Sequence, residues 1–153
     1  PCFIERQKHQ WEYMPTITYK QTEDFEKDLK RLLKKFSTLR EDIEIAKVFA
    51  IELFHLKNID KGAIFQIPNF CTEKLKICKL KKFACKALRG RGVKSGIRII
   101  YAYYVLTKTV DFIEIYFKGE SENENRDRIK QYMLKSNHAW FYYYFYYCRD
   151  CGD

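Results

Sequence analysis

The spacing of apolar side chains changes along the chain and predicts two kinds of element. Between Thr22 and about Lys57, apolar residues recur every three or four positions, as in helices with one buried face. From Glu73 to Lys118 the spacing falls to two, which is typical of strands. A short strand at residues 16–19 precedes the helices, and another helix follows the strands. This order predicts an α+β domain with helices packed on a small, mostly antiparallel sheet.

Each predicted helix has a recognisable start. Thr22 can cap the first helix, whose first turn is acidic and whose last turn is basic. Thr38-Leu-Arg-Glu41 is a capping-box pattern, which opens a second helix with the apolar stripe Ile45, Ala46, Phe49, Leu53 and Leu56. Ser121-Glu-Asn-Glu124 repeats the pattern before the last helix. The first two helices, joined by a few residues, predict an N-terminal helical hairpin.

Three strands are predicted in the second half of the chain. In the first, at residues 74–84, Leu75 and Ile77 lie on one parity and Leu80 on the other, which predicts a bulge near Cys78. A glycine-bearing loop at residues 87–96 follows. Residues 97–105 and 110–118 then form a hairpin.

The chain's length predicts one domain, and the first methionine, Met14, and the aromatic run Trp140–Tyr147 indicate an extension at each end. We assign residues 1–13 to an N-terminal extension, 14–136 to the domain and 137–153 to an aromatic C-terminal extension. No segment approaches the ~18 apolar residues of a membrane span. The N-terminus lacks an apolar signal core, and six cysteines are too sparse for a disulfide scaffold. These features predict a cytoplasmic protein with reduced thiols.

Positive charge is concentrated in residues 74–98. This segment holds ten basic residues and no Asp or Glu, in a chain whose formal net charge is +9. The ten are Lys74, Lys76, Lys79, Lys81, Lys82, Lys86, Arg89, Arg91, Lys94 and Arg98. Such dense like charges favour binding of a polyanion, because each neutralised phosphate releases counterions. The alternative is a solvated basic face without a ligand.

Two other patterns are candidate sites. Cys148-x-x-Cys151, with His138 and either Cys2 or His9, can be drawn as a zinc site, but two Cys pairs at regular spacing would be the stronger signal. We therefore expect neither a metal nor a cofactor. Tyr101 shares a parity with Tyr103, so it either packs in the core or stacks on a nucleobase.

The strands and the loop between them carry a resemblance. Lys79-Leu-Lys81, the glycine-bearing loop, Lys94-Ser-Gly-Ile-Arg98-Ile-Ile-Tyr101, and a last strand ending at Lys118 before a closing helix resemble the RelE/ParE superfamily. These proteins are the toxins of type II toxin–antitoxin pairs, and the resemblance covers residues 14 to 135. It implies a metal-independent endoribonuclease that cuts messenger RNA on the ribosome. In that reaction the ribose 2′-OH attacks the adjacent phosphate and leaves a 2′,3′-cyclic phosphate.

The resemblance also assigns roles to residues and partners. Its basic catalytic positions fall on Lys79, Lys81, Arg98 and Lys118. Cations there would stabilise the charge that develops on phosphorus. Neighbouring residues would contact RNA, namely Lys82, Lys86, Arg89, Arg91, Lys94 and Tyr101. A small acidic antitoxin is the implied protein partner.

One departure from the family pattern leaves the activity open. Many active RelE-type nucleases carry an acid–base tyrosine near the start of the last helix, whereas here the first tyrosine in that region is Tyr132. Glu122 or Glu124 could serve as the base, or could simply cap the helix. ParE-type relatives, which inhibit DNA gyrase by binding it, also lack the full nuclease set. Gyrase inhibition is therefore the alternative function, and a plain RNA-binding module is a third.

Overall fold

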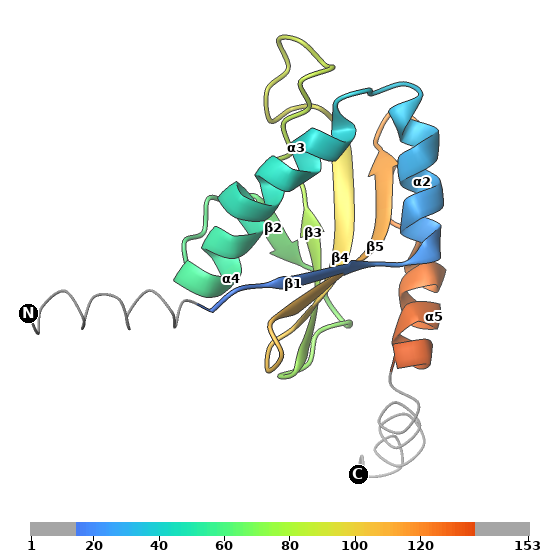
Figure 1. The fold of residues 1–153 in the computed structure, drawn as a ribbon. Helices are drawn as coiled ribbons and strands as arrows, with labels where there is room; N and C mark the ends of the chain where they lie inside the picture. The colour runs from blue at the N-terminus through green and yellow to red at the C-terminus, as the bar shows by residue number, and fades with distance from the viewer. Residues whose placement is uncertain (1–14, 137–153) are drawn as a thin grey trace, which may run out of the picture.

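The computed structural model describes residues 15–136, which form a five-stranded sheet with helices on both faces (Figure 1). The first strand, β1, is parallel to β5, and the other neighbouring strands are antiparallel. The predicted α+β class and mostly antiparallel sheet are therefore confirmed. The strands, in their order across the sheet, are β1 (Thr18–Gln21), β5 (Thr109–Phe117), β4 (Ile97–Tyr104), β3 (Leu75–Leu80) and β2 (Ile64–Gln66).

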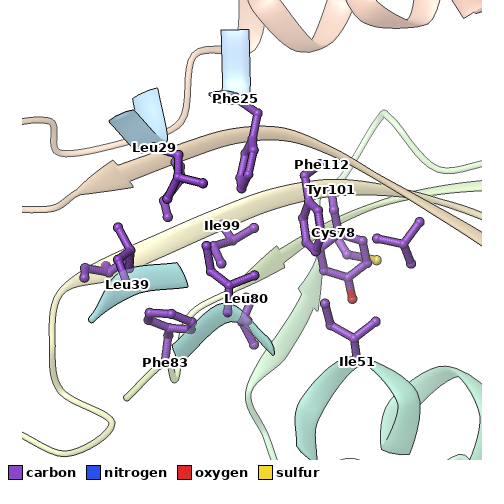
Figure 2. Close-up of a cluster of buried hydrophobic side chains, with 14 of the residues drawn as sticks. Phe25, Leu29, Leu39, Ile51, Cys78, Leu80, Phe83, Ile99, Tyr101 and Phe112 are labelled. Atoms are coloured by element: carbon purple, nitrogen blue, oxygen red, sulfur yellow. The ribbon is translucent and has the colours of Figure 1, made fainter. Parts of the chain in front are cut away.

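Helix α2 (Glu23–Leu33) begins where the sequence predicts. The backbone N–H of Phe25 donates to the Thr22 hydroxyl at 3.2 Å, which satisfies one of the unpaired donors of the first turn. Phe25, Leu29 and Leu32 are buried against the sheet. The ring of Phe25 stacks on Phe112 of β5 with 5.1 Å between ring centroids, and both side chains belong to the buried cluster drawn in Figure 2.

The second helical segment differs from its prediction. It consists of α3 (Leu39–Ala46), a π-helical stretch η1 (Lys47–Glu52) and α4 (Leu53–Lys57). A π-turn holds more residues than an α-turn, so the side chains that face the sheet shift along the sequence. Ile43 and Ile51 are buried, whereas Ile45 and Phe49 of the predicted stripe are exposed. Figure 1 shows α2 and α3 diverging from their connection instead of pairing along their length as a hairpin.

The predicted bulge near Cys78 is wrong. Strand β3 pairs regularly with β4 from Leu75 to Leu80, and the irregularity lies between β4 and β5 at Ile100/Tyr101. Both faces of β3 are covered, so Leu75 packs on one side of the sheet and Leu80 on the other without any slip in register. The edge strand β2 lies in a segment for which the sequence predicted no strand.

Helix α5 (Arg126–Ser136) covers the face of the sheet opposite α2 and α3, where Ile129 and Met133 are buried. It does not use the predicted capping box. Instead, the Asn125 side-chain oxygen accepts from the N–H of Arg128 at 3.1 Å, and the Ser121 hydroxyl donates to a backbone carbonyl. Glu124 is therefore not a capping residue, and its side chain is available for another contact.

Some expectations fall outside the described residues. The extensions 1–13 and 137–153, and with them Cys148, Cys151, His138, Cys2 and His9, are not described. Within residues 15–136, no helix is both long enough and apolar enough to cross a membrane. In the same range, no cluster of three or more His, Cys, Asp or Glu side chains is arranged to hold a metal ion.

Candidate nucleic-acid interface

The strand register puts the four basic residues singled out above on one face of the sheet. Lys79 pairs with Ile100 and Arg98 pairs with Tyr116, and the neighbouring apolar residues of that parity pack with α5. Lys81 continues β3, because its N–H donates to the Ala63 carbonyl at 2.8 Å. Lys118 continues β5 in the same way, through a 2.8 Å bond from its N–H to the Gly96 carbonyl. We call Lys79, Lys81, Arg98 and Lys118 the basic face.

Helix α5 leaves this end of the sheet uncovered. The first turn of the helix lies beside Glu114, whose carboxylate accepts from the Asn125 N–H at 3.0 Å. The helix then runs toward the β4–β5 turn, where the Tyr132 hydroxyl donates to Asp111 at 2.8 Å. Tyr116 and Lys118 lie beyond Glu114 in the opposite direction along β5. As a result Lys118 is exposed, and Arg98 and Lys81 are half-buried.

Two hydrogen bonds hold the Arg98 guanidinium in place and leave its other N–H donors available. Its Nη1 donates to the carbonyl of Lys81 at 2.7 Å and to that of Ile97 at 3.0 Å. Guanidinium carries five N–H donors, and no acceptor among residues 15–136 bonds to Nε or Nη2. The geometry therefore leaves a forked donor for an oxyanion such as phosphate.

Lys79 is ion-paired with Glu124, which reaches over it from the loop before α5. The two side chains are only 15% and 8% exposed. Burial raises the pKa of Glu124, but the hydrogen bond and charge of Lys79 outweigh it, so the pKa lies below its ordinary value. Glu124 is therefore ionised at neutral pH. Glu122, the other candidate base, is exposed.

Tyr116 completes the cluster and was missed by the sequence analysis. It is buried on β5 directly opposite Arg98. Burial, followed by the negative charges of Glu124 and Glu114, raises its pKa to about 12, although Arg98 opposes the shift. The phenol is therefore protonated at neutral pH. The only signal in the sequence was its parity, which it shares with Lys118 two residues later.

The basic loop between β3 and β4 is anchored at both ends and points its charges outward. Phe83 is buried in the core, and its carbonyl accepts from the Ser95 hydroxyl. The Asp42 carboxylate on α3 accepts from the N–H of Lys86 at 3.2 Å, and the hydroxyl of Thr38, the residue before α3, accepts from the N–H of Ala87 at 2.9 Å. The predicted RNA contacts of this loop are all exposed, namely Lys82, Lys86, Arg89, Arg91 and Lys94.

Two tyrosines are held inside the fold by burial or by hydrogen bonds. Tyr101 is completely buried, with its hydroxyl 2.8 Å from His55 Nε2, so no face of its ring can stack on a base. The prediction that Tyr101 contacts RNA is therefore wrong. Tyr132 shares hydrogen bonds with Asp111 and Tyr104 near the β4–β5 turn. Tyr132 cannot take the place of the acid–base tyrosine of the family pattern, because α5 carries it away from the basic face.

Comparisons with known proteins give a likeness but no family assignment. No protein-family model matches the chain, and a search of curated proteins gives no significant match. Among solved structures, a chain of the archaeal RelE–RelB complex from Pyrococcus horikoshii OT3 is similar to it. The identity is 14%, the match covers 70% of this chain and 100% of that chain, and the TM-score is 0.44. At this TM-score the likeness assigns neither a family nor an activity.

Proposed function

We propose that this protein is a RelE/ParE-like toxin that binds messenger RNA on the basic face and cleaves it without a metal ion. The observation that carries the proposal is the alignment of four cations on one sheet face, with Lys81, Arg98 and Lys118 at the end that α5 leaves uncovered. Phosphate binding needs several cationic donors that converge from a rigid scaffold, and sheet strands supply that rigidity. The exposed basic loop adjoins the basic face and adds sequence-independent contacts to the RNA backbone.

In the proposed reaction, each group in the cluster has one task. Arg98, with Lys81 and Lys118, stabilises the negative charge on the phosphorane. The ionised Glu124 carboxylate accepts the proton of the ribose 2′-OH, and Lys79 holds that carboxylate in position. The new bond joins the 2′ oxygen to phosphorus as the bond from phosphorus to the 5′ oxygen breaks. Tyr116, still protonated at neutral pH, donates a proton to the departing 5′ oxygen.

A second candidate function is inhibition of DNA gyrase by binding. It is favoured by the hydrogen bonds of the Tyr132 hydroxyl to Asp111 and Tyr104, because they hold this tyrosine away from the basic face and leave α5 without an acid–base tyrosine there. In either function we propose that an acidic antitoxin covers the basic face when the toxin is held inactive. Opposite charges on the two proteins would speed their association and make it weaken with salt.

The test is cleavage of end-labelled RNA by the purified full chain, both free and on translating ribosomes, with a chelator present. The proposal expects fragments that end in a 2′,3′-cyclic phosphate. A substrate with a single 2′-deoxy nucleotide at the cleavage site should stay intact, because it lacks the attacking hydroxyl. Intact messages together with inhibited gyrase supercoiling would instead support the second candidate.

A further inference from the structure

An exposed phenylalanine lies beside the basic face. Phe65 of the edge strand β2 pairs with Lys79 of β3, and directly paired residues project on the same side of a sheet. In the described part of the chain no strand pairs with the outer edge of β2. Phe65 is 43% exposed, whereas Phe112, Phe25 and Phe83 are buried in the core. Phe65 is therefore not part of either buried core cluster, and much of its ring is open to a ligand.

One cation of the basic face lies over the ring of Phe65. Lys81 Nζ lies 4.1 Å from the ring centroid, a cation–π contact. Aromatic rings set among cations are the usual means by which proteins hold single-stranded nucleic acid: the rings stack on bases, and the cations follow the phosphates. The contact between Phe65 and Lys81 provides one aromatic ring and one cation side by side.

We infer that Phe65 is a base-stacking subsite for single-stranded RNA. It receives the base of a nucleotide at the cleavage site, beside the scissile phosphate that Lys81 helps to bind. Stacking on an edge strand needs an unpaired base, so the subsite selects single-stranded over duplex RNA, with little preference among bases. This inference rests on the proposed function, because it assumes that RNA occupies the basic face.

The chain offers a matched control for this position. Phe49 on η1 is also an exposed phenylalanine, with 62% of its surface accessible, but η1 packs against the other face of the sheet. Neither side chain fills the core, so Phe65→Ala and Phe49→Ala should both leave the thermal unfolding midpoint nearly unchanged. A difference between the two variants in RNA binding then reports on the subsite and not on stability.

The experiment measures binding of a short single-stranded RNA that carries fluorescent 2-aminopurine and 2′-O-methyl groups, which prevent cleavage. Stacking on an aromatic ring quenches 2-aminopurine. The wild-type chain, Phe49→Ala and Phe65→Trp should quench it on binding. In contrast, Phe65→Ala should lose the quenching and bind about 5- to 150-fold more weakly, the range measured when a stacking aromatic is removed.

The remaining outcomes separate the subsite from the proposed function. Lys81→Ala should keep the quenching and reduce the slope of log affinity against log salt by about 0.7, as expected when one phosphate contact to a single strand is lost. If Phe65→Ala binds and quenches like wild type while Arg98→Ala binds weakly, the subsite is refuted and the basic face stands. If the wild-type chain does not bind the RNA, both are refuted.

Discussion

The ion pair between Lys79 and Glu124 gives a quantitative test of how the site is built. Both side chains are largely withdrawn from water, at 15% and 8% exposure. Removing one partner of a fully buried pair costs about 3–5 kcal/mol, because the remaining charge is left uncompensated. Some solvent reaches Lys79, so we expect Lys79→Met and Glu124→Gln each to lower the free energy of unfolding by about 2–4 kcal/mol. Either loss is a large fraction of the stability of a small domain.

The double variant isolates the interaction between the two groups. Lys79→Met combined with Glu124→Gln leaves no unpaired charge, so its cost should fall short of the sum of the single costs by about 1–3 kcal/mol. Equilibrium urea unfolding of all four proteins at neutral pH measures this coupling. A matched surface pair, Arg40 with Glu26, is 54% and 26% exposed and should couple by less than about 1 kcal/mol.

Additive costs at Lys79 and Glu124 would refute this reasoning. They would mean that the two groups do not interact in solution, and that Glu124 is not held over the sheet. Its proposed role as the proton acceptor would then lose its structural basis. A coupling equal to that of Arg40 and Glu26 would lead to the same conclusion, because it would indicate an exposed and screened contact.

Three further predictions follow from other parts of the fold. Burial lowers the pKa of His55 from 6.5 to about 4, so as the pH falls the unfolded chain binds a proton at His55 before the folded chain does. Between pH 6.5 and 4 the free energy of unfolding should therefore fall by up to about 2–3 kcal/mol in the wild type but not in His55→Gln. Urea unfolding at several pH values measures this difference. Equal pH dependence in the two proteins would contradict this. Tyr116→Phe should slow RNA cleavage by about 10²–10⁴-fold with unchanged RNA affinity, measured under single-turnover conditions, and a wild-type rate would exclude Tyr116 as the proton donor. Asp42→Ala leaves the Lys86 N–H unsatisfied and should cost about 1–3 kcal/mol with faster amide exchange in the basic loop, whereas unchanged exchange would show that Asp42 does not anchor it.

The common face of the basic residues could be predicted because strands obey a simple rule. Side chains alternate along a strand, so Lys79 and Lys81 project on the same side of any sheet that contains this strand. The apolar spacing of residues 97–105 predicts the next strand, which contains Arg98 and pairs with β3 in the structure. The same rule led to the wrong prediction of a bulge in β3. Its apolar residues change parity because both faces are buried, and this pattern resembles a bulge when only the sequence is read.

Other features depend on contacts that leave no periodic signal. A π-helical stretch has the same apolar residue types as an α-helix, so the exposure of Phe49 could not be anticipated. Glu124 matched a capping box in sequence, but Asn125 caps the helix instead and Glu124 pairs with a lysine 45 positions earlier in the chain. Phe65 lies in a three-residue edge strand, too short for a periodic pattern to be recognised.

The central claim is that Arg98 stabilises the charge on the phosphate as RNA is cleaved. The most direct measurement is the single-turnover rate of cleavage in the presence of a chelator for the wild-type chain, Arg98→Ala and the control Arg40→Ala, an exposed arginine on α3. Our account predicts equal rates for the wild type and Arg40→Ala, and a rate lower by about 10²–10³-fold for Arg98→Ala, with that variant still folded at the assay temperature. A folded Arg98→Ala variant that cleaves at the wild-type rate would contradict it.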